Sequence, residues 1–133
     1  MKSLNSFLNP KRKENLKFVL SDAFIDEAGH PIEWEMRQLS AKEGAEVQRQ
    51  MLEAKDATGY LRTIVAESIV YPNLHDSDLL AGLSKRDGRP ILKSSDALIA
   101  LLNDAEMNFL MSKYDEYNKL GNSISEEIAE AKN

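Results

Sequence analysis

The chain has 133 residues, a length that suits one domain and lets a folded chain bury roughly two thirds of its unfolded surface. Hydrophobic residues make up 42% of it and charged residues 29%, and no run of about 18 apolar residues predicts a membrane span. Cysteine is absent, which excludes disulfides, thiol catalysis and cysteine-ligated zinc, while the net charge of −5 disfavours free nucleic acid as a partner.

The N-terminus is predicted to be an arm, residues 1–15, ahead of a single domain, residues 16–133. Residues 3–8 can form one or two turns of helix, which Asn9-Pro10 ends. Three apolar residues would share one side of these turns: Leu4, Phe7 and Leu8. They either pack on the chain's own domain or dock a partner. They are too few to form the apolar region of a secretory signal, which is consistent with an intracellular protein.

Charge is uneven along the chain. The start is basic, with Lys11, Arg12, Lys13 and Lys17, and the end is acidic, with Glu126, Glu127 and Glu130. The simpler interpretation is a soluble surface with some attraction between the two ends. The alternative is a basic arm that seeks an acidic partner.

A β-hairpin is predicted over about residues 17–39. The turn at 26–31 contains Gly29, which adopts a positive φ without a steric penalty. After the turn, apolar and polar residues alternate strictly, so that Ile32, Trp34 and Met36 share one face of a strand. An isolated hairpin is marginal in water, so this one must lean on helices or gain strands from a neighbour. Its outer strand is also an edge that another chain could pair with.

Two helices are predicted after the hairpin. Ser40 and Glu43 form a capping box, which begins a mostly exposed helix that runs to about Ala54. Residues 56–59 break that helix and offer a cap for the next one. Residues 60–74 are predicted to be a single helix that is apolar over most of its circumference, lies at the domain centre and is ended by Pro72.

Four shorter helices are predicted in the second half of the chain. Their cap residues are Asp76, then Ser95 or Asp96, then the pair Asn103 and Glu106, and finally the pair Ser123 and Glu126. They are expected to end near residues 83, 102, 120 and 131, with a loop at 85–90 after the first of them. The whole is an α+β fold, mainly α, in which the N-terminal hairpin packs on a bundle of about five or six short helices.

No catalytic constellation is legible in the sequence. The two histidines, His30 and His75, lie in predicted turns, and Gly-x-Ser-x-Gly, a P-loop and Gly-x-Gly-x-x-Gly are missing. Residues 75–78 could in principle hold a metal ion, but capping by Asp76 is favoured because the spacing of an EF-hand is absent. A solvated strand face explains Glu33 and Glu35 better than an acid–base pair does. We therefore expect neither an enzyme nor a cofactor.

The order of motifs resembles the XkdN-like phage tail assembly chaperones of contractile-tailed phages and related prophage elements of Gram-positive bacteria. The resemblance covers nearly the whole chain, and its segments are Ser-Leu-Asn-Ser-Phe-Leu at 3–8, Lys-Phe-Val at 17–19, the hairpin block 24–37, Val-Tyr-Pro-Asn-Leu at 70–74, and the C-terminal block 127–133. The hairpin block and the Pro-Asn-Leu block are the most specific parts. The region 42–59 departs most from the family pattern.

This resemblance implies a non-enzymatic chaperone that binds the phage tape-measure protein, keeps it soluble and aids tail tube assembly. It also implies action in the host bacterial cytoplasm and absence from the mature virion. Further partners to consider are the tail tube protein, a longer frameshifted form of the chain, and a second copy in a homo-oligomer. Nucleic acid and membrane are not expected partners.

Three surfaces are candidates for contact with such a partner. They are the arm at Leu4, Phe7 and Leu8, the hairpin face at Trp34, and the helical stripe at Met107, Met111 and Tyr114. Packing within the chain's own domain is the alternative for each, and it is favoured for all three.

Other functions remain as alternatives. A structural tail or head-completion component would stay in the virion. A DNA-binding regulator needs a basic recognition helix, and its best candidate, residues 85–89, is predicted to be a Gly-Pro loop.

Overall fold

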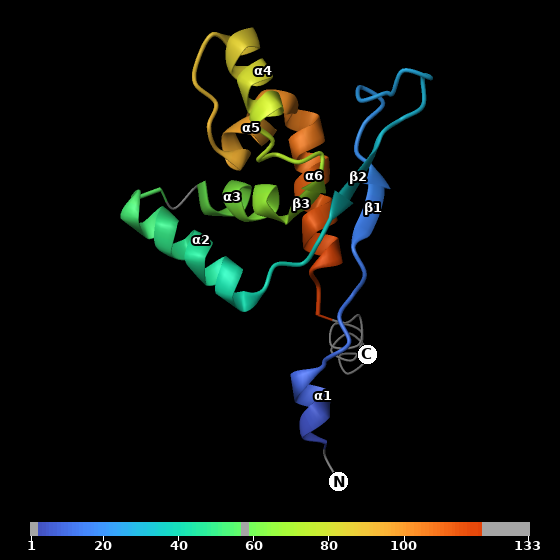
Figure 1. Ribbon diagram of the computed structural model, residues 1–133, viewed down its shortest axis with the longest axis vertical. Coiled ribbons are helices and arrows are strands. Elements are labelled where there is room, and N and C mark those ends of the chain that lie inside the picture. The colour runs from blue at the N-terminus through green and yellow to red at the C-terminus, as the bar shows by residue number, and fades with distance from the viewer. Residues whose placement is uncertain (1–2, 57–58, 121–133) are drawn as a thin grey trace, which may run out of the picture.

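The computed structural model describes residues 3–56 and 59–120. These residues form an α+β, mainly α fold, as predicted (Figure 1). The elements in chain order are α1 (Leu4–Leu8), β1 (Leu16–Val19), β2 (Glu33–Met36), α2 (Ala41–Glu53), α3 (Gly59–Ser68), β3 (Ile69–Tyr71), α4 (Ser77–Asp87), α5 (Ser94–Leu101) and α6 (Asp104–Tyr117). The predicted last helix, 123–131, lies outside the described residues, and the division into an arm (1–15) and a domain (16–133) stays a prediction.

The predicted β-hairpin is confirmed. β1 and β2 pair antiparallel, with Phe18 opposite Trp34, and Gly29 adopts φ 85° in the connecting turn. The predicted apolar face turns inward: Trp34 is 1% exposed, Met36 is buried, and the rings of Phe24 and Trp34 meet edge to face at 5.5 Å. The hairpin therefore packs through the face that the alternation indicates.

The single helix predicted over residues 60–74 is wrong. The helix α3 ends at Ser68, and Ile69–Tyr71 form β3, which pairs antiparallel with β2 to give the sheet order β1-β2-β3. β-Branched residues favour a strand here, and Pro72 pushes the residue before it towards an extended conformation. The Arg37 amide also donates to the Ser68 carbonyl at 2.8 Å, which joins the strand β2 to the helix end. The hairpin thus gains its third strand from its own chain.

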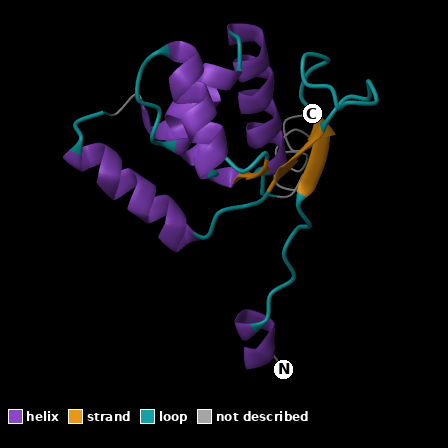
Figure 2. Cartoon of the chain, turned by 45° about the horizontal axis from the view of Figure 1, so that its top comes forward, coloured by secondary structure: helices purple, strands orange, loops and turns teal. Residues whose placement is uncertain are grey.

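The central position of α3 is confirmed. Its buried residues include Ile64, Val65 and Ala66, and the helix packs against α2, α5 and β3. Leu61 and Val70, predicted to add apolar surface to the same helix, are exposed instead. Figure 2 shows the sheet beside the cluster of helices, with α3 among them. The core around it consists of Phe18, Leu20, Trp34, Met36, Val47, Ile64, Val65, Ala66, Ile69, Leu74, Leu83, Ile91, Ala97, Leu98, Leu110 and Tyr117.

The predicted cap residues hold at α2, α4 and α6 and shift at α5. Both bonds of a capping box are present at α2 and at α6, as predicted. Asp76 occupies the cap position of α4 but makes no side-chain bond there, and Lys93 rather than Ser95 or Asp96 occupies the cap position of α5. The mostly exposed character of α2 is confirmed, because Val47 is its one buried residue.

Two predicted helix ends are wrong by several residues. The helix α4 continues through Lys85 and Arg86 to Asp87, and Gly88 ends it with φ 66°. The helix extends there because Arg86 donates both to Asp87 and to the Ala100 carbonyl, which ties the last turn to α5. The helix α6 ends at Tyr117 rather than at Leu120. The basic residues before Gly88 are therefore helical, but Arg86 is already bonded within the chain.

An ion pair links the end of the sheet to the first turn of α2. Arg37 donates to both carboxylate oxygens of Glu43, at 3.0 and 2.7 Å, and the Ser40 amide donates to Glu43 as well. The hydrogen bond from Arg37 has the largest effect and that from the Ser40 amide the next largest. Together they lower the pKa of Glu43 from 4.5 to about 2. Both side chains are more than a third exposed, so water screens much of the interaction.

We expect this pair to make stability depend on acid pH. Because the pKa of Glu43 is lower in the folded chain, its contribution is present above pH 4.5 and is lost as the pH falls towards about 2. The variant Glu43→Gln should lose about 1 kcal/mol or less at neutral pH and unfold with a shallower pH dependence below pH 4.5. Urea denaturation across this range measures both quantities, with Glu33→Gln on the exposed strand face as control. An unchanged slope for Glu43→Gln would contradict the expectation.

Candidate binding surfaces

The N-terminal helix α1 presents three apolar side chains to solvent. Leu4, Phe7 and Leu8 are 72%, 76% and 68% exposed, and no residue of the helix is buried. Figures 1 and 2 both show α1 apart from the rest of the described chain, at the end of an extended stretch. The favoured prediction, that these residues pack on their own domain, is therefore wrong for the described chain. The structure brings the arm residues together and leaves them where a partner can reach them.

The base of this arm is anchored to the C-terminal end of α6. The Lys13 ammonium donates to the carbonyls of Tyr117, at 2.9 Å, and Lys119, at 3.4 Å, and lies 5.7 Å from the centre of the Tyr117 ring. The Tyr117 hydroxyl donates in turn to the Glu14 carbonyl at 2.6 Å. A cation suits the negative end of a helix, where carbonyls lack partners within the helix. Burial raises the pKa of Tyr117, which keeps its hydroxyl a donor.

The second predicted surface, the hairpin face at Trp34, is part of the core. At 1% exposure its indole has no area to offer a partner in this structure. The sequence could not decide this point, because strict alternation gives a strand one apolar face whether its own helices or another protein cover it.

The third predicted surface, the stripe on α6, is only half available. Leu110 and Tyr117 of the same stripe are buried, while Met107, Met111 and Tyr114 are half-buried against the core. Burial raises the pKa of the Tyr114 hydroxyl, as expected for a side chain that faces inward. The structure thus groups these three residues on the inner side of α6, against the core that contains Trp34, and it leaves α1 apart from them.

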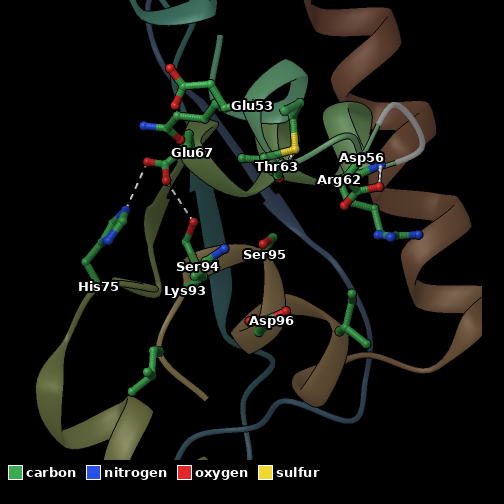
Figure 3. Close-up of a pocket in the computed structure, with 16 residues that line it drawn as sticks. Glu53, Asp56, Arg62, Thr63, Glu67, His75, Lys93, Ser94, Ser95 and Asp96 are labelled. Carbon is green, nitrogen blue, oxygen red and sulfur yellow. Dashed lines mark hydrogen bonds and ion pairs between the residues drawn. The ribbon is translucent and has the colours of Figure 1, made fainter. Parts of the chain in front are cut away.

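Sequence reasoning missed a cleft between α2, α3 and α5. It has a volume of about 700 Å³, and Figure 3 shows the polar residues around it. Its lining includes the apolar residues Met51, Leu92 and Ile99. Leu92 is 76% exposed and Ile99 is 41% exposed. The lining residues are Gln50, Met51, Glu53, Ala54, Asp56, Gly59, Arg62, Thr63, Glu67, His75, Leu92, Lys93, Ser94, Ser95, Asp96 and Ile99. They come from separate stretches of the sequence, so no local motif predicts the cleft.

A polar link lies along one side of the cleft. Glu67 accepts a hydrogen bond from the Ser94 hydroxyl at 2.8 Å, and its other oxygen lies 2.9 Å from Nε2 of His75 (Figure 3). A serine nucleophile needs a base on its hydroxyl, but here the carboxylate stands between serine and histidine, and Ser94 is buried. The arrangement therefore joins α3 to α5 and to the segment before α4, and it has no geometry for acyl transfer.

The described residues contain neither a metal site nor a membrane-spanning helix. Within 3–56 and 59–120, no three His, Asp or Glu side chains gather as metal ligands would. The helices of the same ranges are too short or too polar to cross a bilayer. His75, which the sequence offered as a ligand, contacts Glu67 instead.

Comparisons with known proteins place this fold. The family model described as phage XkdN-like tail assembly chaperone protein matches residues 4–132. The crystal structure of the protein YqbN is similar, with a TM-score of 0.72 at 16% sequence identity, over 91% of this chain and 99% of that one. At that identity the likeness shows the fold alone. No curated protein matches the chain in sequence.

Proposed function

Because the chain belongs to the family of XkdN-like phage tail assembly chaperones, we propose that it binds the tape-measure protein, keeps it soluble and aids assembly of the tail tube around it. The family implies a non-enzymatic role. The proposal includes action in the host bacterial cytoplasm and departure before the virion is complete. The tail tube protein and a longer frameshifted form of the chain are further proposed partners.

The exposed apolar side of α1 is the observation that best supports this proposal. A tape-measure protein is a long, largely helical chain that exposes apolar faces before assembly. A chaperone for it needs apolar surface that is not used in its own core. Leu4, Phe7 and Leu8 provide such surface on a helix, at the end of an arm whose base is fixed at Lys13.

The other predicted surfaces support the proposal less. Trp34 is enclosed, and Met107, Met111 and Tyr114 offer only part of their area because Leu110 and Tyr117 turn the same side of α6 inward. We therefore assign first contact with the tape-measure protein to the arm.

We expect the variant Phe7→Asp to fail to keep the tape-measure protein in solution. A central aromatic residue of an interface typically contributes at least about 2 kcal/mol, which is roughly a thirtyfold loss of affinity. The test co-expresses the full chain with the tape-measure protein encoded nearby and measures how much of that protein is soluble and co-purifies. Ile25→Asp, on the exposed hairpin turn, is a matched control that should behave like the unaltered chain.

The melting temperature separates loss of binding from loss of fold. Because Phe7 is 76% exposed, Phe7→Asp should unfold at the temperature of the unaltered chain. Normal co-purification of the Phe7→Asp variant would overturn the assignment to the arm. A tape-measure protein that precipitates while the unaltered chain stays free would count against the chaperone role.

A structural component retained in the particle is the second candidate function. Mass spectrometry of purified particles distinguishes it, because a chaperone is expected to be absent. A stoichiometric amount of this chain in finished virions would favour the structural role.

A further inference from the structure

The cleft between α2, α3 and α5 has apolar surface that the described chain does not cover. Leu92 and Ile99 are both exposed, and they meet Met51 around one hollow. Scattered exposed leucines are ordinary on a protein surface, but apolar side chains that converge on a cleft indicate a binding site. Its volume of about 700 Å³ lies within the range of about 300 to 1,000 Å³ of known ligand sites.

The charges of the cleft are opposite to those of the arm. Four carboxylates line the cleft, on Glu53, Asp56, Glu67 and Asp96, against two permanent cations, on Arg62 and Lys93. The arm residues 3–12, beyond the anchored Lys13, include two cations, at Lys11 and Arg12, and no acid. The apolar side of α1 therefore suits the apolar residues of the cleft, and the basic residues after α1 suit its carboxylates.

We propose that the cleft binds the N-terminal arm of a second copy of this chain. The arm of the same copy is a poor occupant, because Lys13 fixes its base at the end of α6 and α1 stands away from the other helices in both views (Figures 1 and 2). Each copy has one arm and one cleft, so two copies can exchange arms symmetrically and close into a dimer. Leu4, Phe7 and Leu8 then cover Leu92 and Ile99, and Lys11 and Arg12 face the carboxylates. The cleft and the tape-measure protein therefore compete for the same side of α1.

Sedimentation equilibrium of the full chain tests this dimer. The unaltered chain should pass from monomer to dimer as its concentration rises, with weaker association at higher salt because the pairing is partly ionic. Phe7→Asp in the arm and Leu92→Asp in the cleft should each raise the dimer dissociation constant at least about tenfold. Both side chains are 76% exposed in the monomer, so neither change should unfold it. Ile25→Asp on the hairpin turn is the control and should dimerise normally.

A mixture of the two variants gives the sharpest result. Phe7→Asp keeps an intact cleft and Leu92→Asp keeps an intact arm, so the mixture should form a heterodimer more tightly than either variant pairs with itself. Arm exchange would be overturned if the mixed dimer had a dissociation constant no lower than those of the two variants alone. It would also be overturned if the unaltered chain stayed monomeric at every concentration.

The dimer and the chaperone function fail separately in these experiments. Leu92→Asp leaves the arm intact, so the proposed function predicts normal co-purification of the tape-measure protein, while the dimer inference predicts weakened association. Phe7→Asp should impair both. Normal dimerisation without co-purification would retain the inference and reject the proposed tape-measure contact.

Discussion

Replacing Trp34 with alanine should cost about 3–5 kcal/mol of unfolding free energy, as expected for a buried aromatic side chain. Trp34 is 1% exposed, pairs with Phe18 across the hairpin and meets the Phe24 ring edge to face. Its loss leaves a cavity where the hairpin packs on the helices. A domain is typically stable by about 5–15 kcal/mol, so this loss is a large share of the total and the variant should unfold at a clearly lower urea concentration.

Urea denaturation followed by circular dichroism measures this loss. Trp34→Phe should fall between the variant and the unaltered chain, because it keeps a ring in the same place. Glu33→Ala, next to Trp34 but on the exposed face, should change stability by about 0.5 kcal/mol or less. A Trp34→Ala chain as stable as Glu33→Ala would mean that the indole does not support the core.

The second large loss is expected on α6. Leu110 is fully buried, so Leu110→Ala should cost about 2–5 kcal/mol through lost apolar contact and the remaining cavity. The adjacent Phe109 is 40% exposed and lies under the Lys113 ammonium, 5.5 Å from its ring centre. Phe109→Ala should therefore cost about 1 kcal/mol or less. If Leu110→Ala and Phe109→Ala lost the same unfolding free energy in thermal or urea denaturation, α6 would not pack on the core through the Leu110 side.

This comparison also bears on binding. If Leu110 supports the core as expected, the neighbouring residues Met107, Met111 and Tyr114 serve mainly to fill space beside it. Their half-buried state then reflects the width of the apolar side of α6 rather than a groove for a partner.

Local signals predicted the parts of the fold that depend on a few adjacent residues. The capping boxes at Ser40 and Asn103 need only a side chain and its third neighbour, and both form. The hairpin turn needs a residue that tolerates positive φ, and Gly29 supplies it. Such features are encoded within one turn of chain, so sequence alone suffices for them.

The strand β3 shows where local signals fail. Ile69 and Val70 continue the apolar pattern of the preceding helix, so periodicity allows either a longer helix or a strand. The choice is made by β2, which offers a free edge to residues 69–71. That edge lies more than thirty residues earlier in the chain, so the residues around 69–71 carry no local sign of it.

The candidate site divides in the same way. The apolar side of α1 could be predicted from the spacing of Leu4, Phe7 and Leu8, but its exposure could not, since the same spacing suits a helix packed on its own domain. The cleft could not be predicted at all. Its apolar members, Met51, Leu92 and Ile99, are ordinary residues of three separate segments until the fold brings them together.

The contact between Lys13 and the end of α6 also brings two described segments to one place. The base of the arm lies at Lys13, and Lys13 binds the carbonyls of Tyr117 and Lys119. The arm and the described residues after α6 therefore leave the body of the molecule at one corner. The four residues between α1 and Lys13 span at most about 14 Å. The helix α1 can therefore occupy only positions close to that corner. A partner held there by either segment meets the other at a high effective concentration.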